Sequence, residues 1–145
     1  MKKSKLFTIL LRMVLGWIFL YQGFVAFMDP TWSILPAIEN AQTFPTFYSS
    51  LVQAPMIGFV TFAVKALYVV VGLLLLIGIA TRLASLFGFL LMLFLYFPLL
   101  NFPYIKGGGY VVDYHIVYAL ILLYFLFARG HAHTGGIRSL FKSSR

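Results

Sequence analysis

The chain has 145 residues, of which 62% are hydrophobic and 10% charged, and its mean hydropathy is +0.98. This composition excludes a soluble domain, because a chain of this length cannot bury so much apolar surface. The net charge of +8 is typical of some nucleic-acid-binding proteins. Here the basic residues flank long apolar segments, so we interpret them as determinants of membrane orientation.

Four apolar stretches predict four membrane-spanning helices within a single domain of residues 1–145. Each stretch approaches or exceeds the ~18–20 residues that cross a hydrocarbon core as a helix. They comprise residues 6–28, 56–80, 83–100 and 111–127. The sequence therefore predicts an all-α integral membrane protein, folded as an antiparallel bundle of four helices.

Lysine and arginine residues are distributed unevenly between the two ends of these spans. With the N-terminus placed in the cytoplasm, nine of the eleven basic residues lie on the inner side. The outer side carries only Lys106, and Lys65 lies within a span. Because positive charge is retained on the cytoplasmic side, we expect a multi-pass plasma-membrane protein with both termini in the cytoplasm.

The first span begins after a short basic segment, as a signal peptide does. Its apolar run is too long for a signal peptide, and no small-residue cleavage pattern follows, so we expect a retained helix. Gly16 and Gly23 lie on one face and predict close packing against another helix. Arg12 is expected to extend to lipid phosphates. Asp29 and Pro30 end the helix.

A long outer loop, residues 29–55, follows the first span. Its four prolines preclude one long helix, and its aromatic residues argue against disorder. We expect two short helices at the membrane interface, at residues 33–40 and 46–53. Because long ordered loops are often functional, this loop is predicted to cover the outer mouth of the bundle or to bind a partner.

The second and third spans are separated by little more than Thr81 and Arg82, which predicts an antiparallel hairpin. If residues 56–100 formed one continuous helix, it would measure ~68 Å at 1.5 Å per residue. That is too long for a ~30 Å hydrocarbon core. Pro98 predicts a kink or an end near the outer end of the third helix. Residues 101–110 include three consecutive glycines and are expected to form a flexible outer turn.

Lys65 lies about ten residues into the second span, near the middle of the membrane. A charge at that depth costs at least ~2.5 kcal/mol unless it is paired or reaches the surface. Two interpretations stay open: a buried ion pair or water-facing charge, and a contact to an anion or a quinone oxygen. In both cases we expect Lys65 to face the bundle interior or a partner, with Asp113 as its nearest counter-charge.

Asp113 and His115 open the fourth helix. Asp113 is expected to cap that helix. Residues two apart on a regular helix point about 200° away from each other, but a capping Asp113 precedes the regular turn and escapes this constraint. A carboxylate and a histidine at the end of an apolar pocket suit proton exchange with a quinone, because histidine titrates near neutral pH.

These residues define one candidate site, a pocket between the second and fourth helices that is covered by residues 32–48. We assign Asp113 and His115 as catalytic candidates and Lys65 and Tyr68 as candidate quinone-binding residues. The alternative, in which these groups only pair with one another or with a neighbouring subunit, stays open.

Other chemistry is less well supported. The chain has no cysteine, which excludes thiolate zinc and cysteine-bound iron–sulfur clusters. His131 and His133 form an alternating pair, which is a weak metal signal. The membrane region holds one histidine, so this chain alone cannot supply two axial haem ligands. We therefore expect no haem, iron–sulfur cluster or metal, no nucleic-acid partner, and no independent hydrolase activity.

Four segments carry a family resemblance: Leu11–Gly23, Asp29–Ser33, Gly72–Ala84 and Asp113–Tyr118. Together they resemble the DoxX family, including its DoxD-like thiosulfate:quinone oxidoreductase relatives. The most specific part is the pattern G-x5-G-x2-TRLA, which spans Gly72–Ala84. The pattern D-x-H follows later, at Asp113–His115. The resemblance implies a four-helix membrane subunit of an oxidoreductase system, in which electrons from a compound such as thiosulfate pass to membrane quinone.

The chain departs from the resembling proteins at two positions within the spans and at its ending, where Gly135–Leu140 replaces their usual G-x-x-S-LD pattern. Where they often carry Lys and Glu, it has Ala26 and Tyr68, and Lys65 lies one turn before the latter. Our first hypothesis is a membrane subunit of a quinone-linked oxidoreductase that acts with partner subunits in the bilayer. The second is a non-catalytic accessory or assembly subunit of a larger respiratory or photosynthetic complex. The third is a small-ligand-binding or transport bundle.

Overall fold

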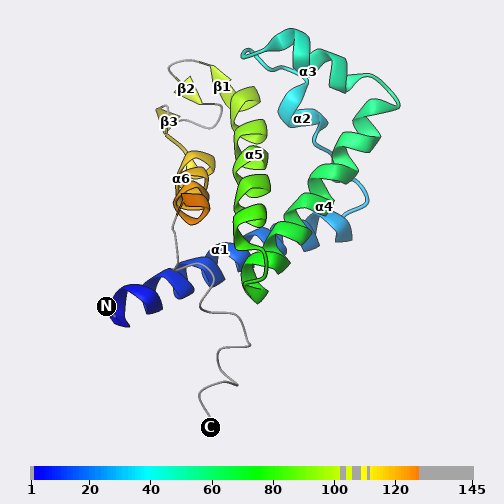
Figure 1. Ribbon diagram of the computed structural model, residues 1–145. Coiled ribbons are helices and arrows are strands. Elements are labelled where there is room, and N and C mark those ends of the chain that lie inside the picture. The colour runs from blue at the N-terminus through cyan, green and yellow to red at the C-terminus, as the bar shows by residue number, and fades with distance from the viewer. Residues whose placement is uncertain (1, 102–103, 106–108, 111, 128–145) are drawn as a thin grey trace.

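The computed structural model describes residues 2–101, 104–105, 109–110 and 112–127, and they form an almost entirely helical fold (Figure 1). Two short helices lie between the first and second long ones. The elements in chain order are α1 (Lys2–Met28), α2 (Leu35–Ile38), α3 (Pro45–Val52), α4 (Met56–Ile77), α5 (Thr81–Leu99), β1 (Leu100–Asn101), β2 (Tyr104–Ile105), β3 (Gly109–Tyr110) and α6 (Tyr114–Phe127). The predicted all-α class is confirmed.

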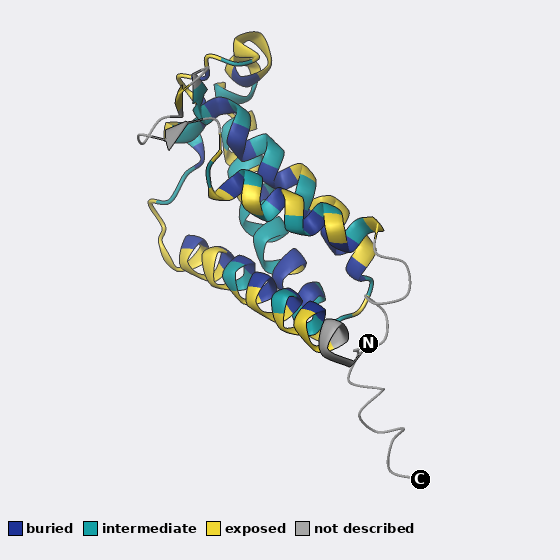
Figure 2. Cartoon of the chain, turned by 90° about the vertical axis from the view of Figure 1, so that its left-hand side faces the viewer, coloured by how far each residue is buried: buried dark blue, intermediate teal, exposed yellow. Residues whose placement is uncertain are grey.

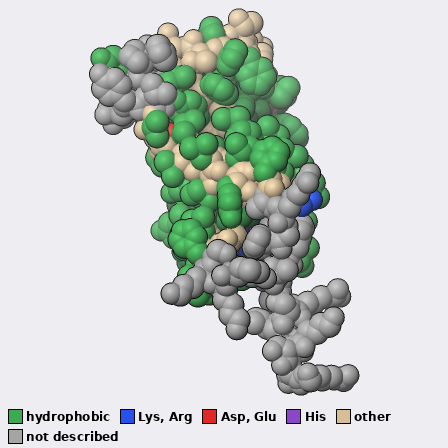
Figure 3. Space-filling model, turned by 60° about the vertical axis from the view of Figure 1, so that its left-hand side comes forward, with side chains coloured by type: hydrophobic (Ala, Val, Ile, Leu, Met, Phe, Trp, Pro, Cys, Tyr) green, Lys and Arg blue, Asp and Glu red, His purple; other side chains and the backbone are tan. Residues whose placement is uncertain are grey.

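Three helices are long and apolar enough to cross a membrane: Leu6–Met28, Met56–Ile77 and Thr81–Leu99. Their outward faces carry large exposed apolar side chains, and Figure 3 shows a described surface dominated by hydrophobic groups. The predicted fourth span corresponds to α6, which has 14 residues. At 1.5 Å per residue it measures ~21 Å, less than the ~30 Å hydrocarbon core.

Close contact between α1 and α4 depends on glycine. A Cβ on Gly72 would overlap the backbone of Leu20 and would lie 2.9 Å from the carbonyl oxygen of Gly16. A Cβ on Gly23 would lie 2.7 Å from the Val69 side chain. Positions later in α1 therefore meet positions earlier in α4, so the two helices are antiparallel. The predicted packing role of Gly16 and Gly23 is confirmed.

The turn from α4 to α5 confirms the predicted hairpin and corrects the prediction for Arg12. Gly78 and Ala80 both adopt positive φ angles, of 79° and 50°. A Cβ on Gly78 would lie 2.7 Å from Nη1 of Arg12, whose side chain is only 3% exposed. The expectation that Arg12 extends to lipid phosphates is therefore wrong. Its charge lies instead at the C-terminal end of α4, where the helix dipole favours a cation.

The α1–α4 loop (residues 29–55) contains the two short helices predicted for it, α2 and α3. Ile34, Ile38 and Tyr48 from this loop are buried in the core. The Ser33 and Thr61 hydroxyl oxygens lie 3.4 Å apart, which places the loop beside the first turns of α4. Thr43 donates a hydrogen bond to the backbone carbonyl of Leu100 at 3.0 Å. The loop therefore covers the end of the helix assembly at which α5 ends.

Residues 101–110, predicted as a flexible turn, contribute to three short antiparallel strands instead. Leu100 pairs with Ile105, and Ile105 pairs with Gly109. Gly107 and Gly108 lie outside the described residues. The glycine run obscured this pairing in the sequence, because glycine is depleted in strands.

Candidate functional site

A cavity of about 350 Å³ lies among α1, α4, α5 and α6, beneath part of the α1–α4 loop. Phe19 and Gln22 of α1, Tyr68 of α4 and His115 of α6 line it. Trp32 of the loop also lines it. This arrangement brings two of the four predicted site residues, Tyr68 and His115, to one cavity and places loop residues over it.

His115 and Asp113 form a hydrogen-bonded pair at the start of α6. Nδ1 of His115 lies 2.6 Å from Oδ2 of Asp113, and the two side chains are 5% and 14% exposed. Oδ1 of Asp113 accepts hydrogen bonds from the backbone N–H groups of His115 at 3.0 Å and Ile116 at 3.3 Å. The predicted helix cap is thereby confirmed, and the same carboxylate also binds the imidazole.

This pairing determines which histidine nitrogen is available for chemistry. A carboxylate is an acceptor, so Nδ1 of His115 carries the hydrogen in the shared bond. In the neutral imidazole, Nε2 is then the basic nitrogen, and Asp113 stabilises the ring when Nε2 takes up a proton. His115 lines the cavity, whereas Asp113 lies behind it, so the pair can exchange a proton with a ligand in the cavity through His115.

Aromatic rings form much of the remaining wall. The ring centroid of Phe19 lies 5.6 Å from that of Tyr68 and 6.5 Å from that of Tyr118. The Tyr114 ring lies 4.0 Å from the His115 ring and 6.0 Å from the Tyr118 ring. Such a wall favours a flat ring as ligand, because aromatic faces stack on one another at these separations.

Lys65 does not line the cavity. Its Nζ lies 3.5 Å from the backbone carbonyl oxygen of Asp29 and 5.3 Å from the ring centroid of Trp32. The predicted pairing of Lys65 with Asp113 is wrong, since the Asp113 carboxylate is engaged by His115 and the α6 backbone. Lys65 contacts the cavity residue Trp32, whose ring lies within cation–π range of the ammonium group.

The negative charge near Lys65 belongs to Asp29. Hydrogen bonds from Thr31, donated by its hydroxyl at 2.6 Å and its backbone N–H at 2.8 Å, hold the pKa of Asp29 below its usual value. The positive charge of Lys65 acts in the same direction. Asp29 therefore remains a carboxylate at neutral pH and forms the acidic neighbour of Lys65.

The cavity residues that were not identified from the sequence include three with polar groups: Gln22, Tyr114 and Tyr118. Gln22 is an amide within an otherwise apolar stretch of α1, and that contrast was an available signal. Tyr114 and Tyr118 are four residues apart, so they share one face of α6. Their spacing was visible, but nothing in the sequence indicated which face points to α1. His131 and His133 lie outside the described residues.

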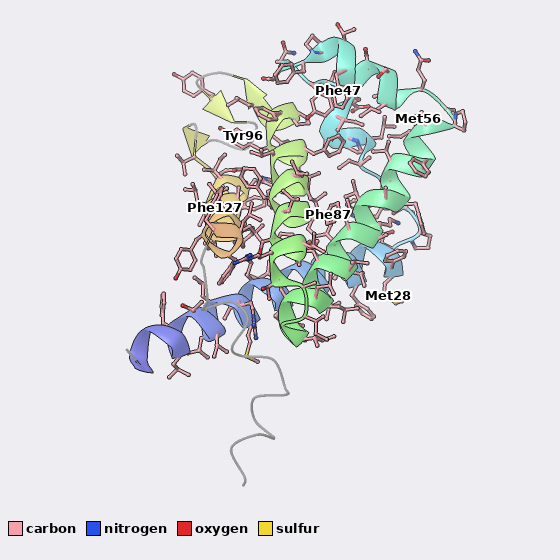
Figure 4. The ribbon with its side chains drawn as sticks, in the orientation of Figure 1. Met28, Phe47, Met56, Phe87, Tyr96 and Phe127 are labelled. Carbon is pink, nitrogen blue, oxygen red and sulfur yellow. The ribbon has the colours of Figure 1, made fainter. Side chains whose placement is uncertain are left out.

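A second hollow has a different chemical character. It measures about 380 Å³ and lies between α4 and α5 on the side of α3, and every side chain that lines it is apolar. Phe47 and Phe87, labelled in Figure 4, are among them. Without polar groups this hollow offers no means to orient or react with a ligand. The cavity beside His115 is therefore the candidate site.

Comparison with known proteins identifies a family but no individual relative. A family model described as DoxX matches residues 7–99, which is more than half of the chain. No curated protein and no solved structure matches. The matched region runs from α1 to the end of α5 and stops before α6. Tyr68 lies inside it, whereas Asp113 and His115 lie beyond it.

Proposed function

The chain belongs to the DoxX family of membrane proteins, and we propose that it is the quinone-binding membrane subunit of an oxidoreductase. One observation carries the proposal: a cavity with aromatic walls contains a histidine whose other ring nitrogen is held by a carboxylate. The oxidation of a sulfur compound such as thiosulfate is the reaction that the resemblance suggests.

The residues around the cavity fit a quinone head group. The volume of about 350 Å³ accommodates one substituted ring. Phe19, Tyr68 and Tyr118 supply faces for stacking and exclude water. Tyr68 also brings a hydroxyl that can donate a hydrogen bond to a quinone carbonyl. A bound quinone would supply the electron-accepting chemistry.

The role of this chain is to bind the ring and to manage its protons. Protonated His115 donates from Nε2 to an oxygen in the cavity, and Asp113 stabilises the imidazolium before the transfer. Asp113 also holds the imidazole in one orientation, because its two oxygens bind the ring and the helix backbone together. We assign electron delivery to partner subunits in the membrane, since none of the side chains in this cavity is an electron carrier.

We further propose a plasma-membrane protein of four spans with both termini in the cytoplasm. The distribution of lysine and arginine, nine residues on one side against one on the other, supports this orientation. In this arrangement α6 is the fourth span, and the α1–α4 loop lies on the outer side. The first residue of α6, Tyr114, lines the same cavity as Gln22, so α6 begins at the level of the cavity.

One observation favours the alternative of a non-catalytic accessory subunit. Ala26 occupies a position where the resembling proteins often carry Lys, and its side chain is buried at 2% exposure. That position serves helix packing in this chain. If the family uses a lysine there for chemistry, this protein contributes structure rather than turnover to a larger complex.

Tryptophan fluorescence tests the quinone proposal directly, because the chain has two tryptophans. Trp32 lines the cavity, whereas Trp17 is exposed on α1. Trp17→Phe leaves Trp32 as the reporter, and Trp32→Phe leaves Trp17 as the matched control. We expect decylubiquinone in detergent to quench the fluorescence of Trp32 saturably. The fluorescence of Trp17 should fall only in proportion to the quinone concentration. Proportional quenching of both would remove the quinone function and leave the accessory role.

A further inference from the structure

The four larger helices form an open row rather than a closed ring. Helix α1 packs against α4, α4 against α5, and α5 against α6, whereas α1 and α6 share no comparable interface in the described residues. Figure 2 views the molecule from the side where α6 and the N-terminal part of α1 lie, and α1 runs there as a separate rod that ends at the N-terminus. The cavity lies between the two ends of this row.

The exposure of the lining residues locates the mouth of the cavity. Phe19, Met92, Leu95 and His115 are buried and form its floor. The exposed lining residues are Gln22 of α1 and Tyr114 of α6, and Tyr114 is 60% exposed. Because these two lie on α1 and α6, which share no comparable interface in the part of the chain that the structure describes, the cavity opens between them.

The α1–α4 loop covers a different side of the same cavity. Trp32 and Ala37 line it from the loop, and the neighbouring Ile34 and Ile38 are buried in the core. Lys65 lies on the Trp32 ring. The loop therefore restricts access from the end of the helices, and the sideways opening at Gln22 is the less obstructed route.

The surroundings of this opening are apolar. Tyr21 and Phe24 are exposed beside Gln22 on α1, and Val117 and Leu120 are exposed along α6. Gln22 lies six residues before the end of α1, which is ~9 Å along the helix axis. In a helix that crosses a membrane, such a position borders lipid rather than bulk water.

We infer that the cavity is entered sideways from the bilayer between Gln22 and Tyr114, and that its ligand is a lipid whose ring binds inside while an apolar tail lies in this opening. The identity of the ring as a quinone rests on the proposed function, whereas the position of the opening does not. This geometry favours the binding of a ligand with an apolar tail, because the tail stays in the lipid and is not exposed to water.

Environment-sensitive labels test the position of the opening without any quinone. The chain has no cysteine, so Gln22→Cys and Tyr114→Cys each provide one site for a bimane label. In liposomes we expect dibrominated acyl chains to quench both labels and aqueous iodide to quench neither. The control is Ser49→Cys, which is exposed on α3 in the loop and should respond to iodide. Quenching at Gln22 and Tyr114 by iodide alone would overturn the inference.

A reversible bridge tests whether the opening is the route of entry. In the Trp17→Phe background, Gln22→Cys and Tyr114→Cys are joined by a cleavable bismaleimide, and Trp32 quenching by decylubiquinone is followed in proteoliposomes. We expect the bridge to slow quenching at least about tenfold, with recovery after cleavage. A bridge between Phe59→Cys and Phe87→Cys, across the apolar hollow on the other side of α4 and α5, should leave the rate unchanged.

The outcomes separate the two claims. An unchanged rate with the Gln22–Tyr114 bridge in place would overturn sideways entry. Absence of saturable quenching before bridging would remove the proposed quinone function. Bromine quenching of both bimane labels would, in that case, still support an opening for a lipid tail.

Discussion

The hydroxyl of Tyr48 donates a hydrogen bond to the backbone carbonyl of Phe94 at 3.0 Å. Pro98 lies four residues after Phe94 inside α5 and has no N–H, so this carbonyl has lost its usual partner within the helix. An unsatisfied carbonyl is costly in an apolar environment. A side chain from the α1–α4 loop therefore supplies the missing bond of a long apolar helix, and it attaches the loop to α5 beside the cavity residue Leu95.

This relationship predicts a coupling between Tyr48 and Pro98. Tyr48→Phe removes the donor and should lower the free energy of unfolding in detergent by ~1–2 kcal/mol. In a Pro98→Ala background the new N–H can bond the Phe94 carbonyl, so the same substitution should cost much less. A double-mutant cycle of unfolding free energies measures the difference. Strictly additive effects would contradict the assigned role of Tyr48.

The burial of Tyr48 predicts a loss of stability at high pH. Burial raises the pKa of Tyr48 to about 12, above the value of about 10 for an unfolded tyrosine. The folded state therefore favours the neutral phenol, and this contribution is complete below pH 10 and lost as the pH rises toward 12. The stability gap between wild type and Tyr48→Phe should narrow over that range. A constant gap from pH 8 to 12 would show that Tyr48 does not titrate in this way.

Glycine contacts predict a strong asymmetry between two positions of α4. Gly72→Ala forces a Cβ onto the backbone of Leu20 and should destabilise the protein by roughly 1–3 kcal/mol or more. Gly58 lies in the same helix, and a Cβ there meets nothing within 4 Å. Gly58→Ala should therefore be neutral or stabilising by up to ~1 kcal/mol. Thermal unfolding in one detergent measures both, and equal effects would argue against the close α1–α4 contact.

Much of the fold was predictable because apolar segments and helix-breaking prolines determine the local conformation of the chain. The three long helices, the hairpin at Thr81 and the two short loop helices follow from span length, the short connection and proline positions. The location of Lys65 did not follow. It depends on α4 extending past the end of α1, which is a matter of tertiary register: Gly23 lies opposite Val69, so Lys65 lies beside Asp29.

The site was predictable in part for the same reason. Asp113 and His115 are close in sequence, so helix capping alone brings them together. Tyr68 and Trp32 depend on the packing of α4 and the loop, and both line the cavity. Gln22 and Tyr114 could not be paired from sequence, since their proximity results from which helix faces meet around the cavity. Arg12 was misplaced because its burial depends on the Gly78 turn.

Substitutions in the His115–Asp113 pair should separate proton transfer from assembly. His115→Ala removes the proposed donor and should lower quinone reduction by the intact complex by ~10²-fold or more. Asp113→Asn preserves a capping side chain but removes the charge that stabilises the imidazolium, so it should lower turnover. Kinetics are compared with subunit recovery after purification in mild detergent. Normal turnover in both variants, or loss of assembly alone, would leave a structural subunit.

The orientation proposal predicts opposite labelling of two exposed sites at the two ends of the helices. Ser49 lies on α3 in the α1–α4 loop, and Ile79 lies in the turn between α4 and α5. Because basic residues concentrate on the side of that turn, it should face the cytoplasm. In intact cells an impermeant maleimide should label Ser49→Cys and should reach Ile79→Cys only after the cells are opened. The cysteine-free wild type is the blank, and labelling of Ile79→Cys from outside would reverse the topology.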